Sequence, residues 1–196
     1  MSGIPNLESW QIEKPAVESD GGLVASQHWQ ASAVGAEVLR QGGNAVDAAV
    51  ATGLAIGCVE PWMSGIGGGG FMMVYLAKER KTYAVEFGMV APQGLDPATY
   101  PLSNATSGDL FGWPGVLEDR NIHGPHAIAV PGHIAGMALA LERFGTRSWQ
   151  DSIAPAIGLA QQGMLADWYA TVMISGGASI LRNNPETART LSLIHI

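Results

Sequence analysis

Residues 44–61 decide the fold of this chain: Asn-Ala-Val-Asp-Ala-Ala-Val-Ala-Thr-Gly-Leu-Ala-Ile-Gly-Cys-Val-Glu-Pro. Asn44 is a preferred helix N-cap residue, and Asp47 follows three residues later, where the helix dipole favours a carboxylate. After Asp47 the side chains are apolar nearly all round, until Glu60-Pro61 ends the helix. Because a helix that is apolar on every side is buried between layers, this stretch predicts a central, buried helix.

A glycine-rich loop over residues 64–70 follows this helix and leads into two apolar strands. The strands are predicted at 71–76 and 82–87, and the charged run 78–81 between them forms the turn of a β-hairpin. Both strands alternate poorly between apolar and polar residues. We therefore expect both faces of the hairpin to be covered.

The loop segment Gly65–Gly70 formally matches the pattern G-x-G-x-x-G. A dinucleotide site needs a strand before this pattern and a helix after it, so that the pyrophosphate meets the helix N-terminus. Here a helix precedes and a strand follows. We interpret the glycines instead as a place where the backbone packs closely against another segment.

Before the central helix, the sequence predicts three segments. Residues 1–20 are expected to form an extended lead-in, and Gly22–Ser26 a short buried strand. A helix is expected from Trp29 to Gln41, and Gly42-Gly43 supplies its left-handed stop.

After the hairpin, residues 88–130 show no clear periodicity and are interpreted as an insertion or a cover over a site. Within this stretch, residues 126–130 are expected to form a short strand. Three helices and a turn are predicted after residue 130. The first helix runs from Pro131 at N1 to Phe144, with Gly145 as its stop. The second is capped by Ser148 and Asp151, divided at Pro155 and closed by Gly163. The last runs from Asp167 to about Leu181, is weakened at Gly176-Gly177, and is followed by a turn at Asn183-Asn184-Pro185. The fold class is therefore α/β (α+β) with a helix-rich C-terminal portion.

Composition excludes several classes of function. The 196 residues carry a net charge of −7 and show no Lys/Arg cluster, which argues against a nucleic-acid partner. The uncharged stretch 48–59 is too short to span a bilayer, and 61–77 is interrupted by glycines, so no membrane segment is predicted. The N-terminus shows no secretory signal, which favours the cytoplasm. Only 14% of residues are charged, which is typical of an incomplete piece of a larger enzyme. The last residues, 191–196, form an apolar segment, and we expect this tail to be truncated or non-native.

Two candidate chemical groups receive a structural interpretation. His123-Gly124-Pro125-His126 could be a metal pair, but it has no carboxylate or Cys at ligand spacing, and Gly-Pro fits a turn. Cys58, the single cysteine, lies at the end of the buried helix with no adjacent base, which is typical of a core residue. The patterns G-x-S-x-G and H-E-x-x-H do not occur. No metal or cofactor is expected.

Several stretches in this order resemble the gamma-glutamyltranspeptidase family, at the N-terminal end of its large subunit. The resemblance covers roughly residues 21–165, and we assign 21–190 to this portion. The matching stretches are Gly22-Leu23-Val24-Ala25-Ser26-Gln27-His28, residues 39–51, Val59-Glu60-Pro61, residues 64–72, Val130-Pro131-Gly132 with residues 141–145, and residues 154–160 with Gly163.

The resemblance implies an N-terminal-nucleophile hydrolase with an αββα sandwich, of which this chain forms part. Such a precursor cleaves itself, and the new N-terminal Thr of the small subunit attacks a γ-glutamyl amide, as in glutathione metabolism. The implied partners are the small subunit from the same precursor and a small-molecule γ-glutamyl or acyl amide. No Thr of this chain, Thr190 included, sits in the family's nucleophile motif, so no catalytic residue is assigned and the chain alone is expected to be inactive.

One substrate-binding position of the family falls within this chain. The resemblance places an Arg that binds the substrate α-carboxylate just after the second hairpin strand, where this sequence reads Glu86-Phe87-Gly88-Met89-Val90-Ala91-Pro92. Gly88 stands in place of that Arg, although Arg80, Lys81 or Arg120 could compensate. Two hypotheses follow: a related acyltransferase or amidohydrolase acting on a γ-glutamyl or other acyl amide, or a non-catalytic relative that serves as a scaffold or binding lobe.

Overall fold

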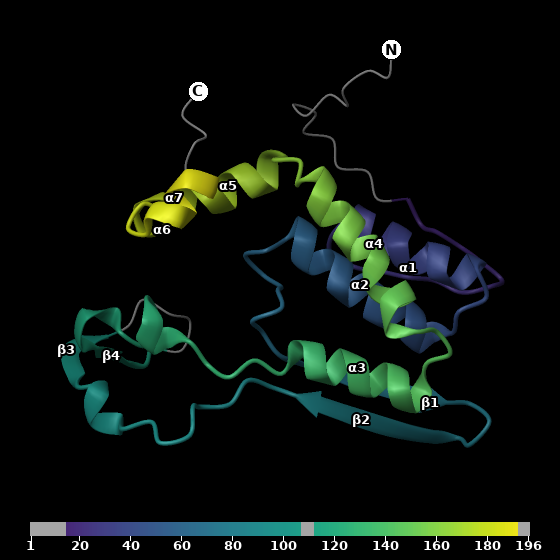
Figure 1. Cartoon of the computed structure of the whole chain (residues 1–196), viewed down its shortest axis with the longest axis horizontal. Helices are drawn as coiled ribbons and strands as arrows, with labels where there is room; N and C mark the ends of the chain where they lie inside the picture. Colours follow the sequence, from purple (N-terminus) through teal and green to yellow (C-terminus); the bar gives the residue numbers. More distant parts are fainter. Residues whose placement is uncertain (1–14, 107–111, 192–196) are drawn as a thin grey trace, which may run out of the picture. The chain divides into compact units, whose positions relative to one another are not determined.

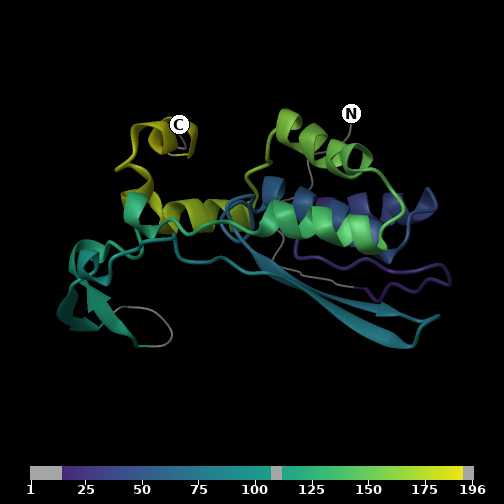
Figure 2. The ribbon, with the colours of Figure 1, turned by 60° about the horizontal axis from the view of Figure 1, so that its bottom comes forward.

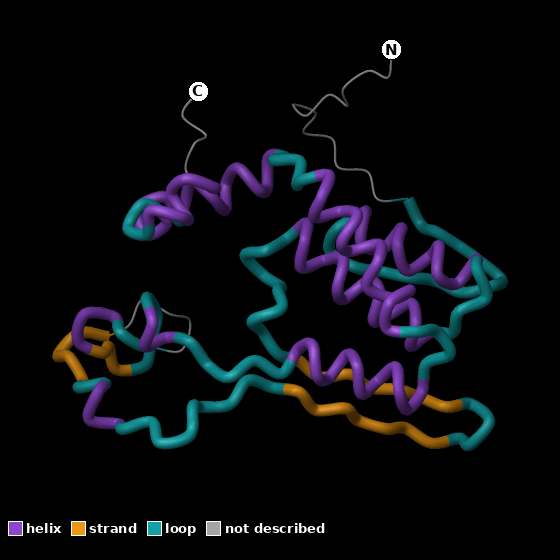
Figure 3. Tube along the Cα trace, in the orientation of Figure 1, coloured by secondary structure: helices purple, strands orange, loops and turns teal. Residues whose placement is uncertain are grey.

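The computed structural model describes residues 15–106 and 112–191. The chain forms two compact units, the first made of residues 1–65 and 141–196 and the second of residues 66–140. Figure 1 shows the helices and strands along the chain, and Figure 3 separates them by type. Most of the helices belong to the first unit, and all of the described strands belong to the second.

The first unit is built around helix α2 (Ala45–Val59), which packs against α1 (Trp29–Arg40) and α4 (Trp149–Gln162) (Figure 1). Asn44 caps α2 by accepting hydrogen bonds from the backbone N–H groups of Val46 and Asp47, and the Asp47 carboxylate accepts from the Asn44 N–H in return. The prediction of a capped, buried central helix is confirmed. Its small residues allow close packing, which a Cβ on Gly35 of α1 would prevent because it would lie 2.2 Å from Thr52 Oγ1.

The second unit contains the predicted hairpin, formed by β1 (Gly70–Leu76) and β2 (Lys81–Phe87), which appears as a twisted ribbon in Figure 2. Helix α3 (His133–Phe144) begins in this unit, and Gly136 in its second turn lies against the Phe87 ring. The expectation that both hairpin faces are covered is wrong within the described chain. Helix α3 covers only one face of the hairpin, so more buried and exposed residues alternate along β1. Phe71, Met73 and Tyr75 are exposed on the other face.

The expected strand at Gly22–Ser26 is absent from the structure, which is a correction to the sequence analysis. These residues have no regular structure and Leu23 is 62% exposed. A strand requires a hydrogen-bonded neighbour, and no described strand pairs with this segment. Of the expected lead-in 1–20, residues 15–20 are exposed and irregular, and residues 1–14 lie outside the described residues.

Residues 88–130 hold more structure than the sequence suggested. Short strands β3 (Leu102–Thr106) and β4 (Pro114–Val116) pair with each other. The single-turn 3₁₀ helix η1 (Pro97–Thr99) precedes them, and two more, η2 (Leu117–Asp119) and η3 (Pro125–Ala127), follow them. The strand expected at 126–130 is wrong, because η3 occupies its start and only an isolated bridge joins Val130 to Val90. Helix α3 begins at His133, two residues later than predicted, and Gly145 follows its last residue.

Two predictions about the C-terminal helices differ from the structure. Pro155 does not divide α4, because Ser148 caps the helix and the flanking Ser152 and Ala156 are buried, which holds the turn in place without the missing N–H. The last predicted helix is split at Gly177 into α5 (Trp168–Gly176) and α6 (Ala178–Leu181). The predicted turn is found at Asn183 and Asn184, and Pro185 begins α7 (Pro185–Leu191). The Asn184 side-chain oxygen accepts from the N–H groups of Glu186 and Thr187 at the start of this helix. Of the expected tail 191–196, residues 192–196 lie outside the described residues.

Candidate functional site

Gly88 occupies the substrate-binding position that the resemblance implies, and three backbone segments meet beside it. The N–H groups of Gly132 and His133 donate to the carbonyl of Gly68, at 3.1 and 3.0 Å. A Cβ on Gly132 would lie 2.3 Å from the Phe87 carbonyl oxygen, and a Cβ on Gly69 would lie 2.6 Å from the same atom. Only glycine fits at these two positions. We call this meeting point of Gly68, Gly69, Gly88 and Gly132 the glycine junction.

The glycine junction confirms part of the interpretation of the glycine-rich loop. Gly69 packs closely against the backbone that follows β2, as expected for a glycine that permits close approach. Gly65 and Gly67 are different, because a Cβ at either would meet nothing within 4 Å.

Gly88 differs from its neighbours in the junction because it has room for a side chain. A Cβ on Gly88 would make one ordinary contact, with Phe71 Cζ at 3.8 Å. Residue 88 lies two positions after Glu86, which is paired with Phe71, so this Cβ direction is that of the exposed hairpin face. The glycine is therefore not required by packing, and the space beside it is open.

Two of the three cations proposed to compensate for the missing Arg lie far from Gly88, and the third is paired with another residue. Arg80 and Lys81 are at the turn end of the hairpin, six residues along the strand from the Gly70–Phe87 pair, a distance of roughly 20 Å. The Lys81 ammonium lies 4.7 Å from the centroid of the Tyr83 ring. The Arg120 guanidinium donates twice to the Glu118 carboxylate, at 2.9 and 2.7 Å, and once to the Thr99 carbonyl. Arg80 and Lys81 are too distant to serve Gly88, and Arg120 is already engaged.

The histidine pair at 123–126 forms a turn, as its Gly-Pro centre predicts. Gly124 has φ +82, and η3 begins at Pro125. The His126 carbonyl accepts from the Tyr100 hydroxyl at 2.9 Å, and the two rings meet edge to face. Across residues 15–106 and 112–191, no three His, Cys, Asp or Glu side chains gather closely enough to hold a metal ion.

Cys58 is half-buried where α2 packs against α4, so it lies at the edge of the core. Its thiol donates to the Ala156 carbonyl at 3.3 Å, across the contact between α2 and α4, and burial raises its pKa. A raised pKa keeps the thiol protonated and therefore a poor nucleophile. In the part of the chain that the structure describes, no helix has the length and hydropathy needed to cross a membrane.

The Asp47 carboxylate is a buried charged group whose tertiary partners the sequence analysis missed. Its side chain is fully buried and accepts four hydrogen bonds, from the Asn44 N–H, the Thr146 N–H and hydroxyl, and the Arg147 N–H. Burial acts to raise its pKa, but these hydrogen bonds outweigh burial and hold the pKa below its ordinary value. The Asn44 amide also donates to the Phe144 carbonyl. The cluster ties the start of α2 to the segment between α3 and α4, which is a structural role.

His133 is a second buried titratable group that sequence reasoning did not single out. It is 9% exposed, and its ring lies edge-on to Phe87 with centroids 6.2 Å apart. Burial lowers its pKa, so the imidazole is neutral. Phe87 points to the helix-covered face of the hairpin, whereas the Gly88 position points to the exposed face. His133 therefore packs in the core beside the junction.

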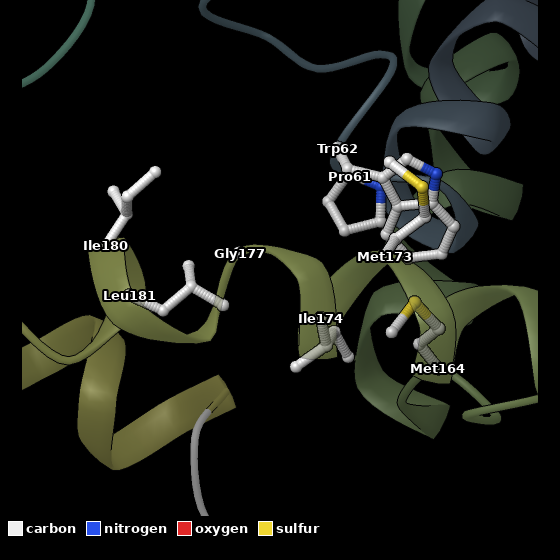
Figure 4. Close-up of a pocket in the computed structure, with 8 residues that line it drawn as sticks. All are labelled: Pro61, Trp62, Met164, Met173, Ile174, Gly177, Ile180 and Leu181. Atoms are coloured by element: carbon white, nitrogen blue, oxygen red, sulfur yellow. The ribbon is translucent and has the colours of Figure 1, made fainter.

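An apolar cavity of about 280 Å³ lies in the first unit (Figure 4). The Trp62 ring at its wall meets Tyr169 edge to face, at 5.8 Å between centroids. The cavity brings no titratable side chain into position for chemistry. It is lined by Pro61, Trp62, Met164, Met173, Ile174, Gly177, Ile180 and Leu181.

Comparison with known proteins gives a consistent set of relatives. The family model described as gamma-glutamyltranspeptidase matches residues 31–193. A glutathione hydrolase proenzyme of Bacillus subtilis (strain 168) is 43% identical over 146 residues, which are 74% of this chain and 24% of that protein. An acylase ACY 1 proenzyme of Pseudomonas sp. (strain SE83) is 35% identical over 188 residues, 96% of this chain and 33% of that protein. The chain superposes on the crystal structure of Helicobacter pylori gamma-glutamyltranspeptidase with a TM-score of 0.78 and 32% sequence identity. The matched residues are 89% of this chain and 47% of the Helicobacter pylori chain. The chain thus spans between a quarter and a third of the length of these curated relatives.

Proposed function

This chain belongs to the gamma-glutamyltranspeptidase family, and from that premise we propose that it is the N-terminal part of the large subunit of an amide-cleaving enzyme. Relatives in this family are named as hydrolases, acylases and transpeptidases, and those named proenzymes support a precursor that is processed. The proposed enzyme takes its nucleophile from a threonine outside residues 1–196, which becomes the N-terminus of a small subunit. The described chain supplies a wall of the substrate site.

The proposed reaction follows from the chemistry of an N-terminal threonine. Its α-amine takes the proton of the hydroxyl, and the oxygen attacks the carbonyl carbon of the substrate amide. Backbone N–H groups stabilise the negative charge on the carbonyl oxygen. The C–N bond then breaks, and the leaving amine takes up the proton. Water, or an acceptor amine, attacks the acyl ester that remains, which releases the acid or a new amide and restores the threonine.

The proposed acyl group differs from γ-glutamyl, and Gly88 is the observation that carries this. A guanidinium holds a carboxylate by two parallel hydrogen bonds, and glycine offers none. Three observations support a site without that cation: the open space over Gly88, the distance of Arg80 and Lys81, and the pairing of Arg120 with Glu118. The match to acylase ACY 1 extends over 96% of this chain, which supports a related acylase.

The test uses the product of the complete gene. Mass spectrometry should show two subunits, the smaller beginning with Thr, and the processed protein should release 4-nitroaniline from an acyl 4-nitroanilide. A Thr→Ala change at the new N-terminus should abolish both events. The competing hypothesis, a non-catalytic scaffold or binding lobe, predicts an unprocessed protein without turnover, and that result would refute the proposal.

A further inference from the structure

The exposed face of the hairpin presents an aromatic ring at the open position over Gly88. Phe71 is 76% exposed, and its Cζ atom is the nearest atom to the place that a Cβ at residue 88 would occupy, at 3.8 Å. The ring is thus uncovered where a side chain at position 88 would lie against it. An uncovered aromatic ring beside an open space suits contact with an apolar group.

The charge on this face disfavours an anion. Glu86 is paired directly with Phe71 across the hairpin, and it is exposed on the same face, two residues before Gly88. A substrate carboxylate at the Gly88 position would meet this like charge without the compensating guanidinium. An uncharged acyl group meets neither penalty.

We propose that Phe71 is a specificity-determining residue that contacts the acyl group of the substrate, and that this acyl group is apolar and uncharged, of the aryl-acyl or alkyl-acyl class. The inference rests on the proposed function, because it assumes that the space over Gly88 receives the acyl group. It adds a residue and a substrate class to that proposal. Phe71 supplies an apolar surface, and Gly88 leaves room for the group to reach it.

The test compares three 4-nitroanilides as substrates of the processed enzyme: phenylacetyl, hexanoyl and γ-glutamyl. The wild type should show a higher kcat/KM for phenylacetyl or hexanoyl than for γ-glutamyl. Phe71→Ala should lower kcat/KM for the preferred apolar substrate by about 10-fold, since small apolar contacts discriminate substrates by such factors. Phe71→Leu, which keeps an apolar side chain, should lose less.

Tyr75→Ala is the matched control, because Tyr75 lies on the same strand and the same exposed face, four residues from Phe71. It should leave the ratio of the apolar to the γ-glutamyl substrate unchanged. Cleavage into two subunits reports that each variant folds. A wild type that prefers the γ-glutamyl substrate overturns both this inference and the acyl group given in the proposed function. A wild type that prefers an apolar substrate, together with a Phe71→Ala variant that changes the ratio no more than Tyr75→Ala does, overturns this inference alone. A processed wild type that hydrolyses none of the three amides refutes the proposed function itself.

Discussion

Replacing Asp47 by alanine should lower the free energy of unfolding by about 3–5 kcal/mol, because four hydrogen-bond donors lose their charged acceptor at once. The carboxylate accepts hydrogen bonds at 2.8 Å from the Asn44 N–H, 2.8 Å from the Thr146 N–H, 2.6 Å from the Thr146 hydroxyl and 3.1 Å from the Arg147 N–H. Hydrogen bonds to a charged group contribute roughly 1.5–3 kcal/mol each. The sum over four hydrogen bonds is an upper limit on the loss of stability. Water that enters the emptied site recovers part of this loss, and the variant no longer has to bury a charge, so the expected loss falls to the stated range.

The matched control is Asp151→Ala. Asp151 occupies the same third position of its helix, α4, as Asp47 does in α2, but it is exposed, and among the described residues its carboxylate accepts from the Ser148 hydroxyl alone. Its loss should cost no more than about 1 kcal/mol. Urea unfolding followed by circular dichroism measures both variants, with the slope m held common. If Asp47→Ala shifts the unfolding free energy by no more than Asp151→Ala, the tertiary role assigned to Asp47 is wrong.

Three further outcomes are expected. The pKa of Asp47 in the folded protein lies below its ordinary value of 3.8. The carboxylate therefore contributes its full stabilisation above about pH 5, and this contribution is lost as the pH falls below 3.8 and through the folded-state pKa. Acid unfolding of the wild type and of Asp47→Ala should show a difference in stability that shrinks over this range. Gly136→Ala places a methyl 2.1 Å from the Phe87 ring and should destabilise by about 1–3 kcal/mol, whereas Gly158→Ala, with nothing within 4 Å, should be neutral or stabilising in a thermal melt. Gly88→Arg should raise the kcat/KM ratio of γ-glutamyl over apolar 4-nitroanilides by about 10-fold, and the neutral Gly88→Gln should not; an equal response would show that charge at residue 88 does not select the acyl group.

Local signals predicted the parts of the fold that local chemistry determines. The Asn44 cap, the left-handed Gly42 and the helix end at Gly163 depend on neighbours within a few residues, and each is found as expected. The misplaced strand at residues 22–26 and the uninterrupted α4 depend on what packs against them, which sequence spacing does not give. The partners of Asp47 show the same limit, because Thr146 and Arg147 lie 99 and 100 residues away along the chain.

The resemblance implied a position for the candidate site, but the sequence did not show what surrounds that position. The resemblance placed the substrate carboxylate at residue 88, and nothing in the sequence showed that Phe71, seventeen residues earlier, would lie against it. That proximity arises from the hairpin register, which pairs Phe71 with Glu86. The same register removed Arg80 and Lys81 from consideration, although they are close to Gly88 in sequence.

The exposed hairpin face connects the proposed partner with the proposed substrate. Phe71, Met73 and Tyr75 form an apolar row that the described chain leaves uncovered, and the open position at Gly88 lies on the same face. A row of this kind favours association with another apolar layer. In the proposed enzyme, the small subunit covers this face and brings its threonine toward the Gly88 end. Substrate would then bind between the two subunits, with this chain contributing the acyl contact and the small subunit contributing the nucleophile.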